Sequence, residues 1–167
     1  MKRITYILLI IIGFSFQNCG IYSFSGGSVG NAKTIQIDYF PNNASFVEPT
    51  LSNVFKVTLE DKFLSQTNLS LVKSNGDLYL NGEITDYRIS PTAATADQTA
   101  AQNRLTIRVK VHFENRLDEE KNFDKTFSHF YDYAADKLLV GSVLDEAYSV
   151  ILDRITQDVF NEALAQW

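Results

Sequence analysis

Hydrophobic and polar residues alternate most regularly between Arg104 and Glu114. The apolar residues of this stretch are Leu105, Ile107, Val109, Val111 and Phe113. Successive side chains of a strand point to opposite faces of a sheet, so the alternation predicts a strand with one apolar and one polar face. The polar positions include Arg104, Arg108 and Lys110. We therefore expect a one-sided antiparallel sheet with a row of basic side chains on its solvent face.

Weaker alternation predicts strands on both sides of this one. Lys33 to Phe40 is expected to be a first strand, because Ile35, Ile37 and Tyr39 alternate with polar residues, and Pro41 is expected to end it. A strand is expected from Leu78 toward Tyr87, after an extended piece that begins at Leu69 and a turn at Ser74–Asp77. Phe123 to Tyr133 is expected to be the last strand.

Residues 89–103 are rich in Ala, Thr and Gln and contain Pro91. Alternation is lost in this part of the chain. The composition predicts a long connection between the two central strands, and connections of this length are usually functional or mobile in compact domains.

Two segments have helical spacing. The first is predicted to begin with Pro49 and to end near Thr67, with apolar residues recurring at intervals of three and four. The second is predicted to begin at Ser142. Its apolar stripe comprises Leu144, Tyr148, Ile151, Ile155, Val159 and Ala163. The order β-α-β-β-β-α predicts an α+β two-layer sandwich, a four-stranded mixed sheet with both helices on one face, as a single domain over residues 33–167.

The N-terminus predicts export and lipid attachment. Lys2 and Arg3 precede an apolar run that is too short for the roughly 20 residues of a membrane-spanning helix, so residues 1–18 are expected to be a signal peptide. The run ends at Cys19 in a sequence that resembles the lipobox of bacterial lipoproteins, which implies a diacylglyceryl anchor on Cys19. Residues 19–32, rich in glycine, are expected to be a flexible tether. An ordinary signal peptide with a chance cysteine is the alternative, because Phe16, Gln17 and Asn18 replace the usual leucine and small residues.

Composition narrows the possible partners. The net charge of −5 gives no reason to expect binding to nucleic acid, and any anion binding must be local. Cys19 is the sole cysteine, so the fold depends on its core and not on disulfides.

No arrangement of residues predicts an enzyme, a cofactor or a metal. His112 and His129, the two histidines, match no established metal-binding spacing even with Glu114 nearby. The acidic residues 118–120 are typical of a solvated turn. A hydrolase whose activity depends on the histidines or on added metal remains open as an alternative.

The basic row is the candidate binding site. Arg104, Arg108 and Lys110, with Arg88 on the adjoining hairpin, could bind phosphate or carboxylate groups of a lipid headgroup or an acidic protein surface. The alternative is an ordinary solvated strand face whose charge is balanced by Glu83 and Glu114.

Several stretches together resemble the LptE family of lipopolysaccharide-assembly lipoproteins. They are Gly20–Gly26 after the lipobox cysteine, Tyr39–Ala44, Pro49–Ser52, Asn103–Ile107 and Ile155–Asn161. The resemblance covers nearly the whole mature chain, and it rests on the order and spacing of these stretches more than on any one of them.

The resemblance implies a function that composition does not. Members of this family plug the lumen of LptD, a large outer-membrane β-barrel, help to assemble it and assist insertion of lipopolysaccharide into the outer leaflet. It also implies two helices on a four-stranded sheet, and a place in the outer membrane, lipid-anchored and facing the periplasm or inside the barrel. Besides the hydrolase, two alternatives remain: a periplasm-facing lipoprotein chaperone or scaffold for another envelope component, and a soluble secreted domain.

Overall fold

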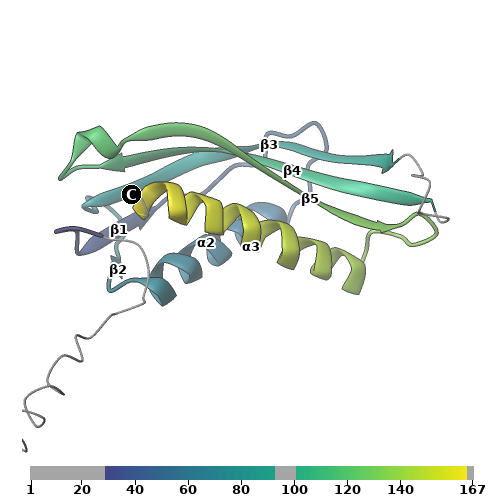
Figure 1. The fold of residues 1–167 in the computed structure, drawn as a ribbon, viewed down its shortest axis with the longest axis horizontal. Helices are drawn as coiled ribbons and strands as arrows, with labels where there is room; N and C mark the ends of the chain where they lie inside the picture. Colours follow the sequence, from purple (N-terminus) through teal and green to yellow (C-terminus); the bar gives the residue numbers. More distant parts are fainter. Residues whose placement is uncertain (1–28, 93–100, 165–167) are drawn as a thin grey trace, which may run out of the picture.

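The computed structural model describes residues 29–92 and 101–164. The elements, in chain order, are β1 (Thr34–Ile37), α2 (Leu51–Gln66), β2 (Ser70–Leu71), β3 (Leu78–Thr92), β4 (Gln102–Asn115), the 3-10 turn η1 (Glu119–Lys121), β5 (Phe123–Ala134) and α3 (Ser142–Leu164) (Figure 1). The α+β class with two helices is confirmed. The signal peptide, Cys19 and residues 20–28 of the tether lie outside the described residues.

The sheet has five strands in the order β2-β1-β3-β4-β5, so the prediction of four was wrong. The additional strand is β2, which pairs in parallel with β1 over two residues. The amide of Ser70 donates to the carbonyl of Lys33 and the amide of Val72 to that of Ile35, both at 2.9 Å. The sequence predicted an extended piece from Leu69 but did not count it as a strand, since two exposed residues are too short for alternation to be visible.

The central hairpin is longer than predicted. Strand β3 continues to Thr92 and β4 begins at Gln102, with Ser90 opposite Arg104 and Thr92 opposite Gln102. Residues 89–92 and 102–103 of the expected connection are therefore strand. Pro91 is tolerated because it lies on a part of β3 that β1 does not reach, and an open edge accommodates a residue without an N–H.

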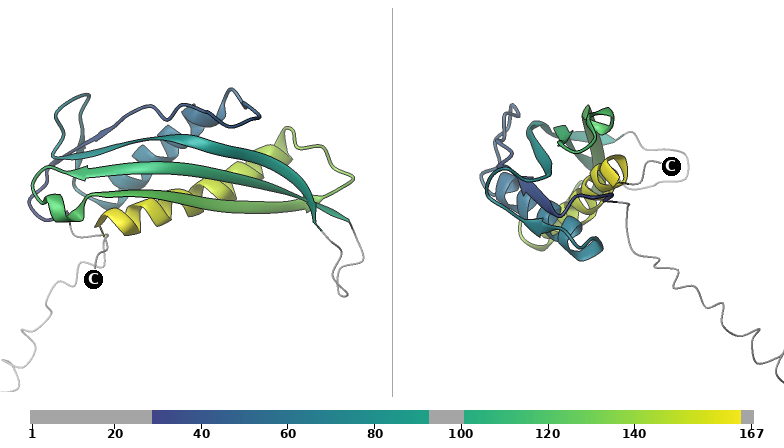
Figure 2. Two further views of the ribbon diagram at one scale, coloured as in Figure 1. Left: turned by 90° about the horizontal axis from the view of Figure 1, so that it is seen from above. Right: turned by 90° about the vertical axis from the view of Figure 1, so that its left-hand side faces the viewer.

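Both helices cover the same face of the sheet, as predicted (Figures 1 and 2). Helix α2 begins at Leu51, and Pro49 belongs to the turn that precedes it. Lys62 of α2 joins the two helices, since its ammonium lies 2.7 Å from Asp153 and 3.2 Å from the side-chain oxygen of Gln157.

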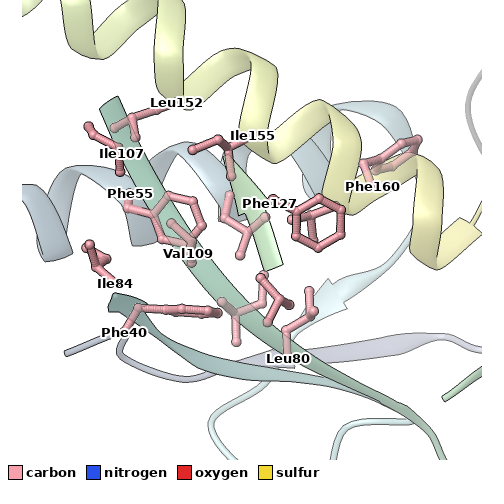
Figure 3. Packing of buried hydrophobic residues seen from close by; sticks show 14 of the residues in the cluster. Phe40, Phe55, Leu80, Ile84, Ile107, Val109, Phe127, Leu152, Ile155 and Phe160 are labelled. Carbon is pink, nitrogen blue, oxygen red and sulfur yellow. The ribbon is translucent and has the colours of Figure 1, made fainter. Parts of the chain in front are cut away.

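One hydrophobic cluster fills the space between the layers (Figure 3). Each layer contributes its predicted apolar positions. Leu51, Phe55, Leu59 and Phe63 of α2 and the five alternating apolar residues of β4 have no exposed surface. Phe63 packs edge-on against Phe160 of α3, with ring centroids 5.2 Å apart, so the two helices also contact each other directly.

The turn before β3 holds the beginning of β1. The Asp77 carboxylate accepts the amides of Lys33 at 2.8 Å and Thr34 at 3.0 Å, and also the Thr34 hydroxyl at 2.9 Å. In return the Thr34 hydroxyl accepts the amide of Asp77 at 2.9 Å. These bonds lower the pKa of the Asp77 carboxyl, with the Lys33 amide as the largest cause.

Candidate functional site

The candidate site is the face of the sheet that the helices leave uncovered, called the open face below. Apolar residues of β4 from Leu105 to Phe113 point to the helices, so the residues between them point away. Arg104, Arg108 and Lys110 therefore lie on the open face, as the alternation predicted.

A β-bulge brings Arg88 to the same face. The pairing of β3 with β4 shifts between Ile84 and Asp86, which leaves Thr85 without a paired residue on β4. Glu83 points to the open face before the bulge, and Asp86 and Arg88 point there after it, whereas Tyr87 is buried. Without this extra residue Arg88 would point toward the helices, because successive side chains alternate.

Arg104 is fully engaged within the sheet. Its Nε and Nη2 atoms each donate to an oxygen of Asp132 on β5, at 2.7 Å, and its guanidinium lies 3.7 Å from the centroid of the Phe130 ring. The hydrogen bonds to Asp132 raise the pKa of the guanidinium. A bidentate pair stacked on an aromatic ring fixes this side chain, and binding an additional anion would require the pair to loosen.

Arg88 and Arg108 are more available than Arg104. They share one carboxylate, Asp86, at 3.8 Å and 4.0 Å, and their side chains remain 58% and 51% exposed. Contacts this long between exposed groups contribute little to stability. Arg108 lies opposite Asp86 in the pairing of β3 with β4, and Arg88 follows two residues after Asp86 on the same face. One carboxylate between two arginines leaves positive charge available to an anion here.

Lys110 lies beside a shallow hollow of about 430 Å³ on the open face. The hollow is lined by Asp38, Tyr39, Pro41, Asn81, Gly82, Glu83, Lys110, His112 and Asp124. Tyr79 stands next to it, and its hydroxyl donates to Asp38 at 2.6 Å, which is the main reason that the pKa of this tyrosine is raised. Carboxylates outnumber cations in the lining, so this end of the open face favours cationic or neutral polar groups over anions.

The two histidines lie on opposite faces of the sheet. His112 is on the open face, with its Nδ1 3.1 Å from Asp124. His129 points to the helix side, with its Nε2 2.6 Å from Asp158 of α3. They cannot share a metal ion in this arrangement. In the described part of the chain no group of three His, Cys, Asp or Glu side chains is placed to hold a metal.

The carboxylates that pair with the basic row are not Glu83 and Glu114, which the sequence suggested. Glu114 pairs with Arg116 at 3.3 Å, and Glu83 accepts the amide group of Asn43 at 2.6 Å. Asp132 and Asp86 take their place. Knowing how β5 aligns with β4 would have placed Asp132 opposite Arg104. No feature of the sequence predicts the bulge that orients Asp86.

The fold and the open face define a small α+β domain in which helices cover one face of the sheet and the other face is polar and charged. Residues 32–163 match the model of a family described as LptE, lipopolysaccharide-assembly. Because the match spans most of the chain, this protein belongs to the LptE family. No curated protein sequence matches it.

Solved structures share its fold at low sequence identity. A hypothetical protein from Chlamydia trachomatis is 11% identical, with 81% of this chain and 99% of that chain covered and a TM-score of 0.53. A minor lipoprotein from Acinetobacter baumannii is 13% identical, with 78% and 91% covered and a TM-score of 0.49. The rare lipoprotein B of Shewanella oneidensis is 14% identical, with 76% and 89% covered and a TM-score of 0.42. Of these three, the first supports the fold, and none supports a function.

In the described residues no helix combines the length and hydropathy that crossing a membrane requires. Membrane attachment through Cys19 remains a prediction from the sequence.

Proposed function

We propose that this protein is an outer-membrane lipoprotein, anchored through Cys19, that plugs the LptD barrel, helps to assemble it and assists the insertion of lipopolysaccharide. The observation that carries the proposal is the family match over residues 32–163. An exposed sheet face made of charged and hydroxyl side chains is compatible with a barrel lumen, which is polar in outer-membrane barrels.

Co-purification tests the proposal. The tagged lipoprotein is extracted from outer membranes in mild detergent, and the proteins that remain bound are identified and quantified. We expect LptD in equimolar amount, and none with an unrelated lipoprotein that carries the same tag. Retention of a different envelope component in place of LptD would support the chaperone or scaffold alternative and contradict the plug.

Within this function, we propose that the basic row contacts the phosphates of lipopolysaccharide. Arg88 and Arg108 are the main contacts, because both are exposed and share only Asp86. Arg104 and Lys110 have smaller roles, since Arg104 is held by Asp132 and Lys110 borders an acidic hollow.

A double variant tests this contact. Arg88→Gln with Arg108→Gln should weaken lipopolysaccharide binding by about tenfold or more, since a hydrogen bond to a charged group contributes about 1.5–3 kcal/mol. Lys73→Gln with Lys137→Gln removes the same charge elsewhere on the surface and should leave binding unchanged. Equal affinity of the two double variants in a purified binding assay would assign the basic row to ordinary solvated surface.

A further inference from the structure

Strand β5 is a long strand at an edge of the sheet. It spans Phe123–Ala134 and pairs with β4 on one side, while no described strand lies on its other side (Figure 2). The opposite edge is formed by β2, which has two residues. A long unpaired edge offers a row of backbone donors and acceptors to another extended chain.

The alternation of hydrogen bonds between β4 and β5 shows which backbone N–H and C=O groups of β5 point away from β4. The amide of Ala135 donates to the carbonyl of Ala101 at 3.0 Å, which continues the register that pairs Tyr133 with Asn103. Hydrogen-bonded pairs alternate along an antiparallel ladder, so odd-numbered residues of β5 bond to β4. The outward N–H and C=O groups therefore belong to even-numbered residues. They are Asp124, Thr126, Ser128, Phe130, Asp132 and Ala134.

Two features that commonly block strand addition, proline and a bulge, are absent from β5. Its pairing with β4 runs without a register shift from Phe123 to Ala134, and its sequence contains neither proline nor glycine. By contrast, the distal part of β3, which β1 does not cover, contains Pro91. Proline and bulges are common protections of exposed edges. Here a proline protects the uncovered part of β3, whereas β5 has neither a proline nor a bulge.

The surroundings of the edge favour a basic segment. Helix α3 crosses the helix side of β5 (Figure 2). Its carboxylates contact side chains of β5 on that side: Asp158 lies 2.6 Å from His129, and Glu162 lies 2.7 Å from Lys125. On the open face the outward row carries Asp124, which lies 3.1 Å from His112, and Asp132, which is already held by Arg104. A strand laid along the edge would pass Asp124 on one face and Asp158 on the other, whose partners in the described chain are histidines, so lysine or arginine at alternate positions would complement it.

We propose that the free edge of β5 binds an extended segment of LptD, with basic side chains, as an additional strand of this sheet. The proposal rests on the plug function above. Backbone hydrogen bonds to the even-numbered residues of β5 provide affinity, and the carboxylates on the two faces select the segment.

A proline substitution tests the edge directly. Ser128→Pro removes an outward N–H and places a ring in the path of an added strand, while the bonds of β5 to β4 involve its neighbours. The matched control Ser128→Ala removes the hydroxyl and keeps the backbone donor. In co-purification from outer membranes we expect Ser128→Ala to retain LptD and Ser128→Pro to lose it by about tenfold or more, with the purified lipoproteins giving equal circular dichroism spectra.

Amide exchange in the unmodified protein provides a measurement that does not depend on the fold of a variant. In the isolated lipoprotein the amides of Thr126, Ser128 and Phe130 should exchange rapidly and those of Phe127 and His129 slowly. In the purified complex with LptD, all five should be protected. Slow exchange of the even-numbered amides in the isolated chain would overturn the proposal, with concentration-dependent protection indicating a second copy and concentration-independent protection indicating this chain's own N-terminal segment.

The outcomes separate this inference from the function on which it rests. If LptD is recovered equally with wild type, Ser128→Ala and Ser128→Pro, the strand addition is wrong and the plug function stands. If wild type recovers no LptD, both are wrong.

Discussion

Asp77 shows how one side chain can connect distant parts of this chain. It lies in a turn, yet it accepts three hydrogen bonds from Lys33 and Thr34 at the beginning of β1. Its own carbonyl accepts the amide of Arg116, just after β4, at 2.9 Å. A carboxylate that accepts amide donors is stabilised in its charged form, which is why its pKa is lowered from the usual 3.8.

The charge of Asp77 should make stability depend on pH. Folding lowers its pKa, so its stabilising contribution is present above the unfolded value near 3.8 and is lost as the pH falls through the lower folded value. We expect Asp77→Asn to lower the melting temperature at pH 7, and the difference from wild type to shrink as the pH falls below 3.8 and through the lowered folded pKa.

Exposed Asp136, in the loop after β5, provides the control. Asp136→Asn should have the same melting temperature as wild type at pH 7 and after acidification. A melting temperature of Asp77→Asn equal to wild type at pH 7 would show that the carboxylate does not stabilise the fold.

Residue patterns predicted the site only in part. Alternation along β4 was enough to place Arg104, Arg108 and Lys110 on one face, because the period of a strand is fixed. It could not predict that Asp132 neutralises Arg104, since that contact depends on how β5 aligns with β4. Whether each basic side chain is available to bind an anion therefore depends on its neighbours on other strands.

At the scale of elements, the pairing of β3 with β4 requires a glycine. Gly82 has φ of +157°, and a Cβ added there would overlap the carbonyl oxygen of Lys110 and lie 2.8 Å from a ring carbon of Phe40. Phe40 has no exposed surface, so its ring occupies the space that the glycine leaves. The packing of the segment after β1 thus depends on this one position in β3.

Substitution of Gly82 should be severe. Gly82→Ala forces either the ladder or the Phe40 ring to move, and we expect a loss of about 4 kcal/mol or more in the free energy of unfolding, or failure to fold. Gly141→Ala is the matched control. Gly141 has φ of +54° and nothing within 4 Å of an added Cβ, so the cost should be about 1 kcal/mol from backbone strain alone. Urea denaturation measures both, and similar losses would contradict the steric explanation.

Long elements were predictable from the sequence and short or irregular ones were not. The helices and β4 contain enough residues for a repeat to be evident. Residues 89–92 and 102–103 were assigned to a connection because their composition is typical of loops, whereas cross-strand pairing holds them in the hairpin. Tertiary pairing outweighs composition in such segments.

At the scale of the molecule, both layers contribute to one continuous core. Ile107 and Val109 at the centre of the sheet are fully buried among Phe55 of α2 and Ile155 of α3 (Figure 3). No apolar cluster of the described residues stands apart from it. The helices and the sheet should therefore unfold together, as expected for a single domain.

Denaturation followed by two probes tests this cooperativity. Far-UV and near-UV circular dichroism should give one coincident transition, and Ile107→Ala should shift both by the same amount, with a loss of about 2–5 kcal/mol. Thr106→Ala, one residue away on the open face, should change stability by less than about 1 kcal/mol. Separate transitions for the two probes would show that the layers are independent units.

The unpaired Thr85 has a consequence for how this chain can change in length. Beyond Thr85, the face to which each residue of β3 points depends on this single extra residue. Because of it, Tyr87 points toward the helices and Arg88 toward the open face. Deleting that residue would turn Arg88 into the apolar interior and expose Tyr87, although no side chain had been substituted. Evolution can lengthen or shorten the turns of such a protein far more freely than this one position within a strand.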